Sequence, residues 1–166
     1  MYYENIFRAL GKDNIRYVVA GGIALVLHGV VRLTADLDLI VDLERDNLKR
    51  FIQAMNDLGY RPRNPIEAVA MLDPVQRDQW RREKGMTVFS FVDPAQPMGL
   101  VDVFIEENIP FPEIMQNRVV MTAKDITISV ISRSHLKRLK QEAGRPQDLA
   151  DIEAIEELEK QEKKER

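Results

Sequence analysis

Hydrophobic positions along the 166-residue chain follow two periods, and the change between them predicts the order of its strands and helices. Short apolar runs and alternating apolar positions indicate strands, whereas apolar residues spaced three and four apart indicate helices. The expected strands are 15–20, 37–41, 87–92, 100–105 and 126–130. The expected helices are 4–10, 21–29, 46–58, 112–116 and two that begin at about 133 and 146. Asp46 is expected to cap the third of these helices.

This order predicts an α+β (α/β) fold, a mixed sheet of about four or five strands with helices packed on it. Strands 87–92 and 100–105 flank a proline-containing connection, so we expect them to pair antiparallel. Gly144 is placed to end one helix and Pro146 to begin the next. Residues 133–160 are therefore expected to form a C-terminal helical pair.

Composition is typical of a soluble globular protein and narrows the metal chemistry open to it. Hydrophobic residues make up 45% and charged residues 31%, and residues 1–166 are expected to form a single domain because this length suits one core. No apolar run is long enough for a bilayer, and the N-terminus lacks the basic start of a signal peptide, so we expect a cytoplasmic protein with no membrane partner. The chain has no cysteine and two histidines, which argues against disulfides and zinc, so any metal must be held by oxygen.

Basic residues gather in two places, although the net charge is −3. One group precedes the glutamate-rich tail and forms either a local basic site or a solvated helical face. The other surrounds Trp80, where it either holds a nucleic-acid strand or lies exposed on a helix whose tryptophan packs on the body. The first group is Arg133, Lys137, Arg138, Lys140 and Arg145, and the second is Arg77, Arg81, Arg82 and Lys84.

Two carboxylates open the strand 37–41. Asp36 and Asp38 are two residues apart, so along a strand their side chains point the same way. Adjacent carboxylates repel each other unless a cation lies between them, and a hard metal such as Mg²⁺ is the expected cation. Asp102 is the only charge in the run Gly99-Leu-Val-Asp-Val-Phe-Ile, where a buried carboxylate is costly unless it is paired or binds metal. The three aspartates together predict a site for Mg²⁺ and phosphate.

The order of these motifs resembles the nucleotidyltransferase superfamily that includes DNA polymerase beta. Its pattern is a glycine pair opening a helix, here Gly21 and Gly22, then a D-x-D pair on a strand, then one more acid on a later strand. The closer likeness is to the stand-alone prokaryotic branch that includes the AbiEii-type toxins. Two passages carry it, His28-Gly-Val-Val-Arg-Leu-Thr-Ala-Asp-Leu-Asp and Leu139-Lys-Gln-Glu-Ala-Gly-Arg-Pro-Gln-Asp-Leu-Ala-Asp-Ile. Residues 60–98 match no motif of the family.

The resemblance implies an enzyme that moves a nucleoside monophosphate from an NTP to an acceptor hydroxyl and uses two Mg²⁺ ions, for which Mn²⁺ is expected to substitute. In this assignment Asp36 and Asp38 bind both ions, and Asp102 holds the ion that binds the attacking hydroxyl. Gly21 and Gly22 let the triphosphate approach the start of the helix, although a tight turn is the structural alternative.

The remaining nucleotide-binding residues also come from the resemblance. Arg32, Lys140 and Arg145 are candidates for the charge of the triphosphate, and Thr34 for a hydrogen bond that supports the aspartate pair. Asp148 has either a role in the site or the ordinary role of an acid in the first turn of a helix. Lys140 shares a helical stripe with Arg133 and Lys137, and this stripe faces either the nucleotide cleft or solvent.

The acceptor implied by the resemblance is tRNA or a protein hydroxyl in preference to a small molecule such as an aminoglycoside, with a cognate toxin or antitoxin as a partner. Two alternatives stay open. The first is a silent or regulatory protein that keeps the fold, against which the intact aspartate set argues. The second is a metal-dependent phosphohydrolase, against which the glycine pair before D-x-D argues.

Overall fold

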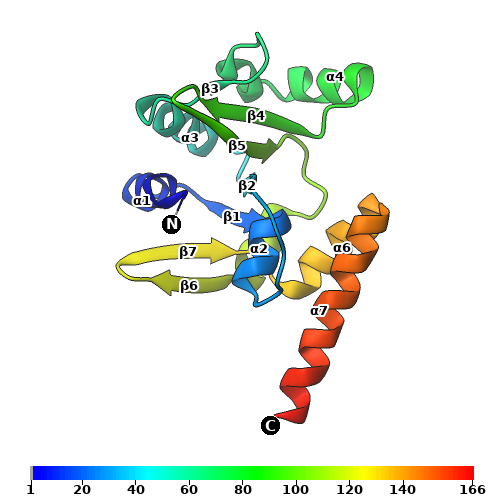
Figure 1. The fold of residues 1–166 in the computed structure, drawn as a ribbon. Helices are drawn as coiled ribbons and strands as arrows, with labels where there is room; N and C mark the ends of the chain where they lie inside the picture. The colour runs from blue at the N-terminus through cyan, green and yellow to red at the C-terminus, as the bar shows by residue number, and fades with distance from the viewer. Residues whose placement is uncertain (1) are drawn as a thin grey trace.

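The computed structural model describes residues 2–166 and contains one seven-stranded mixed sheet, in the order β3-β4-β5-β2-β1-β7-β6 (Figure 1). The strands are β1 (Tyr17–Ala20), β2 (Leu37–Val41), β3 (Arg61–Pro62), β4 (Val88–Asp93), β5 (Gln96–Phe104), β6 (Val119–Ala123) and β7 (Ile126–Val130). The helices are α1 (Glu4–Lys12), α2 (Gly21–Leu27), α3 (Arg45–Asp57), the 3₁₀-helix η1 (Ala68–Leu72), α4 (Pro74–Lys84), α5 (Phe111–Asn117), α6 (Arg133–Ala143) and α7 (Pro146–Lys164).

The α+β class and the C-terminal helical pair are confirmed, but the prediction of four or five strands was too low. The two extra strands, β3 and β6, lie at the two edges of the sheet. β3 is only two residues long, and most side chains of β6 are exposed on both of its faces. An edge strand whose side chains are mostly exposed needs no alternation of apolar and polar residues. The spacing of apolar residues therefore did not indicate either strand.

The pairing of the strands is mixed. β2 runs antiparallel to β1 and parallel to β5, and β1 is parallel to β7. β4 and β5 form the expected antiparallel pair. This arrangement places β2 and β5, which carry the aspartates, side by side in the middle of the sheet.

Trp80 belongs to the hydrophobic core. Its side chain is 4% exposed, and its ring lies 5.8 Å from that of Phe89 in β4. Phe89 in turn contacts Phe91, against which α3 packs Phe51. The nucleic-acid interpretation of the tryptophan is therefore wrong, because a base cannot stack on a buried ring.

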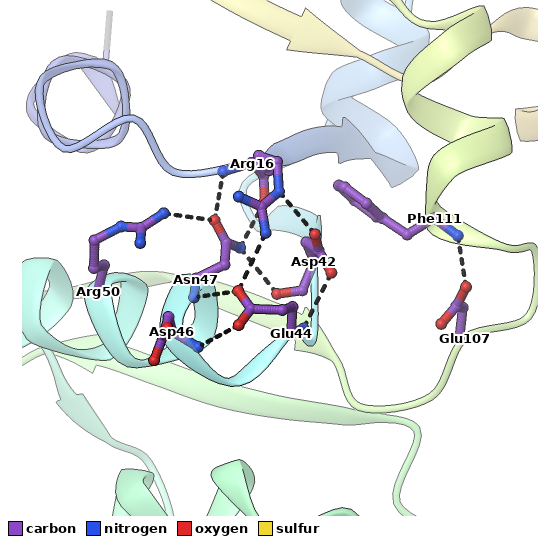
Figure 2. A network of polar contacts seen from close by, with 8 residues as sticks. All are labelled: Arg16, Asp42, Glu44, Asp46, Asn47, Arg50, Glu107 and Phe111. Carbon is purple, nitrogen blue, oxygen red and sulfur yellow. Dashed lines mark hydrogen bonds and ion pairs between the residues drawn. The ribbon is translucent and has the colours of Figure 1, made fainter.

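A buried amide joins α3 to the sheet (Figure 2). Asn47 accepts a hydrogen bond from the backbone N–H of Arg16 and donates to the carbonyl oxygens of Arg16 and Asp42. Glu44 caps α3, since its carboxylate accepts from the backbone N–H groups of Asp46 and Asn47. The prediction that Asp46 is the cap was wrong by two positions; Asp46 lies in the first turn.

The chain ends in α6 and α7. Gly144, with a φ of +64°, ends α6, and Pro146 begins α7 as expected. α7 passes beside α2 and continues beyond the body of the sheet to the C-terminus (Figure 1). Among residues 2–166, no helix combines the length and the apolar character needed to cross a membrane.

Candidate active site

A row of four residues crosses the middle of the sheet at one level. Ala20 of β1 lies opposite Asp38 of β2, Asp38 opposite Asp102 of β5, and Asp102 opposite Ser90 of β4. Residues opposite each other in a sheet point to the same face, so the two carboxylates are neighbours. The Ser90 hydroxyl donates a hydrogen bond of 2.6 Å to Oδ1 of Asp102. The structure thus brings together two aspartates that are 64 positions apart in the sequence.

Asp36 lies just before β2 and has a different environment. Its Oδ1 accepts a hydrogen bond of 2.8 Å from the backbone N–H of Leu100, at the start of the strand segment that leads to Asp102. Its Oδ2 has no hydrogen bond to any part of residues 2–166. Within this described range, no three His, Cys, Asp or Glu side chains form a ready metal cluster. Asp38 and Asp102 therefore form a pair, with Asp36 turned toward Leu100.

Burial and mutual repulsion change the acidity of this pair. Burial raises the pKa of Asp38 to about 7, with further contributions from the charges of Asp102 and Asp36, while Lys140 and Arg145 oppose the rise. Burial also raises the pKa of Asp102, against the hydrogen bond from Ser90. A bound cation stabilises such a pair, because it neutralises the repulsion between the two carboxylates.

The two glycines make room for side chains of the protein itself. Gly21 has a φ of +61°, and a Cβ atom there would overlap the carboxylate of Asp38. A Cβ atom on Gly22 would lie 2.6 Å from Oγ1 of Thr34. Thr34 thus packs on Gly22 and forms no hydrogen bond with the aspartates within the described chain, contrary to its expected role. α2 itself has seven residues and is shorter than the predicted 21–29.

A cleft of about 610 Å³ opens on the face that carries Asp38 and Asp102. A volume in this range is suitable for a ligand of nucleotide size. The sheet supplies one side, and α6 with the start of α7 supplies the other. Its apolar lining consists of Ala20, Val88, Phe104, Leu136, Leu139 and Ala143, and the rest of its lining is Gly21, Asp38, Thr87, Asp102, Glu106, Asn108, Lys140, Glu142, Arg145 and Asp148.

Of the three predicted cations, Lys140 and Arg145 line the cleft and Arg32 does not, and two acids of α7 already pair with all three. Nζ of Lys140 lies 2.7 Å from Oδ2 of Asp151 and 3.5 Å from Oδ1 of Asp148. Nε of Arg145 donates to Asp148 at 2.7 Å, and Arg32 forms an ion pair with Asp151. Both acids are buried. Sequence reasoning found Asp148 and missed Asp151, which lies three residues further along the same helical face.

The basic stripe of α6 faces α7, and of its three cations only Lys140 also lines the cleft. Arg133 pairs with Glu162, Lys137 with Glu159 and Lys140 with Asp151. These ion pairs form a ladder between the two helices. Lys140 is its most buried member and the one that also lines the cleft.

Asp148 combines the two roles that the sequence left open. It is the third residue of α7, and one of its oxygens accepts a hydrogen bond from the backbone N–H of Arg145, as an acid in a capping box does. It also lines the cleft and contacts Lys140. The arginine held by Asp148 has a side chain that is 75% exposed, so this guanidinium is accessible to a ligand.

No protein-family model and no curated protein matches the sequence of this chain. Solved structures do match its fold. The lincosamide antibiotic adenylyltransferase LnuA, in its lincomycin-bound form, has 18% identity and a TM-score of 0.56, with 91% of this chain and 92% of that chain covered. ANT(2")-Ia in complex with adenylyl-2"-tobramycin has 15% identity and a TM-score of 0.55, with 92% and 84% covered.

A third match is a nucleotidyltransferase, assigned as such without demonstrated activity, from Thermotoga maritima. It has 12% identity and a TM-score of 0.57, and the alignment covers 98% of this chain and 91% of that chain. Identities this low show the fold alone. The chain adopts the nucleotidyltransferase fold, and its aspartates, cleft and basic residues must be interpreted on that framework.

Proposed function

We propose that this protein is a nucleotidyltransferase that moves a nucleoside monophosphate from an NTP to an acceptor hydroxyl. The observation that carries the proposal is the position of Asp38 and Asp102. They lie opposite each other on neighbouring strands, and they line the cleft together with Lys140 and Arg145. Nucleotidyl transfer needs charge neutralised and two oxygens placed in line, which requires little other chemistry from the protein.

The carboxylate pair fits a hard divalent cation. Mg²⁺ in enzymes is commonly held by one or two carboxylates together with substrate phosphates, and the elevated pKa values of Asp38 and Asp102 mark a pair that lacks a neutralising charge. The free Oδ2 of Asp36 makes a third donor available for the second ion that the sequence resemblance implies. Bound there, Mg²⁺ or Mn²⁺ would neutralise the triphosphate charge that develops during transfer.

The other residues that line the cleft bind the nucleotide. Lys140 and Arg145 bind the outer phosphates, and the apolar residues of the cleft, among them Phe104 and Leu139, bind the nucleoside. The acceptor oxygen forms a bond to the α-phosphorus while the bond from that phosphorus to the bridging oxygen breaks and pyrophosphate leaves. Asp102 orients the acceptor, and its Oδ2, which is not engaged by Ser90, accepts the hydroxyl proton.

The proposed acceptor is a hydroxyl of tRNA or of a protein, in a cytoplasmic system that includes a toxin or antitoxin partner. The likeness of residues 28–38 and 139–152 to the AbiEii-type branch supports this part of the proposal. Lincomycin, which is bound in the LnuA structure, and tobramycin, whose adenylyl derivative is bound in the ANT(2")-Ia structure, are the small-molecule acceptors that a test must include.

Calorimetry tests the nucleotide site directly. Each NTP is titrated into the protein with Mg²⁺, with Mn²⁺ and with EDTA, and binding is expected only with a metal, since a triphosphate beside three aspartates is otherwise repelled. Asp38→Asn should abolish this binding. Asp13→Asn, which changes an exposed acid at the end of α1, is the matched control. Equal affinity with and without metal would contradict the proposal.

Intact-mass measurement then identifies the acceptor. The protein, Mg²⁺ and each NTP are incubated with total tRNA, with the product of a neighbouring gene, or with an antibiotic. A mass increase of one nucleoside monophosphate identifies the acceptor. Release of phosphate or nucleoside monophosphate without such an increase would indicate a phosphohydrolase, and binding without any turnover would indicate a regulatory protein.

A further inference from the structure

Arg63 extends the row of the aspartates by one strand. Its backbone N–H donates a hydrogen bond of 2.9 Å to the carbonyl oxygen of Ser90. The register of β3 against β4, in which Pro62 lies opposite Phe91, places Arg63 opposite Ser90 and therefore on the face that carries Asp102. Strands are about 4.8 Å apart, so the side chain of Arg63 is long enough to reach over Ser90 toward Asp102. Its charge accordingly opposes the rise in the pKa of Asp102.

Arg63 differs from the other cations of the site in having no partner. Lys140, Arg145 and Arg32 are paired with acids of α7. The guanidinium of Arg63 is exposed and forms no hydrogen bond or ion pair with any residue from 2 to 166. A planar cation with five free donors is suited to bind the oxygens of a phosphate.

The two flanks of the aspartate pair carry different cations. In the sheet, Arg63 lies on the β4 side of Asp102 and Asp38 lies on the other side. The charges of Lys140 and Arg145 oppose the rise in the pKa of Asp38. In nucleotidyl transfer the attacking and leaving oxygens lie in line on opposite sides of the α-phosphorus. If the outer phosphates lie at Lys140 and Arg145, the acceptor must approach from the flank of Asp102, where Arg63 lies.

We infer that Arg63 forms an acceptor subsite and binds a phosphate group carried by the acceptor next to its reacting hydroxyl. This inference rests on the proposed function and adds to it the chemical class of the acceptor. A free arginine at this position repels a cationic aminoglycoside, and a neutral hydroxyl of a protein offers no anion for it to bind. It suits the terminal phosphates of a nucleic-acid strand or the phosphate of a small molecule.

The exposed Tyr2, which precedes α1 and contacts the first part of β5, strengthens the case for a nucleic-acid strand. The Tyr2 hydroxyl donates to the carbonyl oxygen of Met98 at 2.6 Å, and Tyr2 is 55% exposed. Met98 lies toward the start of β5 from Asp102, whereas Phe104 and the cleft lie toward its end. An exposed aromatic ring and an unpaired arginine are the kinds of group that hold a single-stranded nucleic acid.

Fluorescence anisotropy with a labelled 12-nucleotide single-stranded RNA tests the subsite. We expect Arg63→Ala to weaken RNA binding about tenfold and to reduce the slope of log affinity against log salt by about 0.7, the value for one lost phosphate contact to a single strand. Arg45→Ala is the matched control, because Arg45 is also exposed and without a partner within residues 2–166, but lies in α3. Competition by adenosine monophosphate up to millimolar concentration distinguishes a small phosphate ligand from a strand.

NTP calorimetry separates this inference from the proposed function. Arg63→Ala should bind NTP and Mg²⁺ as the wild type does and should raise the KM for the acceptor while leaving kcat within about twofold. Equal RNA binding by the Arg63→Ala and Arg45→Ala variants would overturn the inference, as would loss of NTP affinity in Arg63→Ala. Transfer to a protein or an antibiotic that the Arg63→Ala change leaves unaffected would also overturn it. A failure of NTP to bind the wild type would count against the proposed function alone.

Discussion

Gly21 leaves the space in which the carboxylate of Asp38 lies, because a Cβ atom at position 21 would overlap that carboxylate. The glycine that opens α2 and the aspartate of β2 are thus parts of one site. Glycine is required at position 21 for a second reason, since its φ of +61° is costly for other residues.

Gly21→Ala should abolish NTP binding and lower the free energy of unfolding by about 2–4 kcal/mol, since both the overlap with Asp38 and the positive φ act against it. Gly85→Ala is the matched control. Gly85 has the same φ of +61°, and a Cβ atom there meets nothing within 4 Å. It should cost only about 1 kcal/mol and leave NTP binding intact. Urea unfolding and calorimetry measure both variants, and equal behaviour would mean that the contact with Asp38 is unimportant.

Asp38→Asn should stabilise the metal-free protein at alkaline pH. The pKa of Asp38 is about 7 in the folded protein and 3.8 in the unfolded chain. The wild type is therefore fully stable in this respect below about pH 4, and it loses stability as the pH rises through about 7. In EDTA, the variant should exceed the wild type by about 1–4 kcal/mol at pH 8 and by much less at pH 5. Urea unfolding at the two pH values checks this. A variant that is less stable at pH 8 would show that the Asp38 carboxylate is not strained by burial.

In the ion-pair ladder between α6 and α7, the pair at the cleft should contribute more to stability and to NTP binding than the pairs further from it. Lys140→Ala leaves the buried Asp151 with less compensation and should cost about 2–4 kcal/mol, with roughly tenfold weaker NTP binding. Lys137→Ala removes a more exposed ion pair and should cost less than about 1 kcal/mol, with NTP binding unchanged. Urea unfolding and calorimetry compare the two. Similar losses in both would mean that Lys140 is only one more pair between the helices.

His28→Gln should flatten the acid side of the stability profile. Nε2 of His28 lies 2.7 Å from the carbonyl oxygen of Ile131, and burial holds the pKa of His28 below its usual value of 6.5. The unfolded chain therefore takes up a proton first, and the wild type loses stability as pH falls below about 6.5. Glutamine keeps an N–H donor but does not titrate. The difference between the two unfolding curves at pH 7 and pH 5.5 measures the effect, and parallel curves would contradict it.

The central strands and the aspartates could be predicted because their signals are local. A buried strand needs apolar residues whatever lies beside it. Residues 17–20, 37–41 and 126–130 therefore each show a strand pattern in the sequence itself. The spacing of Asp36 and Asp38 predicted one shared direction along a strand, but Asp36 lies just before β2 and its carboxylate accepts from the backbone N–H of Leu100. The glycine pair, the D-x-D pair and the later acid also followed one another in an order that a known fold uses.

The tertiary structure alone decided which residues meet. Ser90 and Arg63 join the aspartates through the pairing of β3, β4 and β5, and strand order leaves no periodic trace in a sequence. The same holds for Asp151, since which face of α7 meets Lys140 depends on how two helices pack. The sequence by itself determined the central strands and the acids, because these depend on spacing along the chain. The partners of each charge depended on register and helix packing, because those contacts join residues that are far apart in the chain.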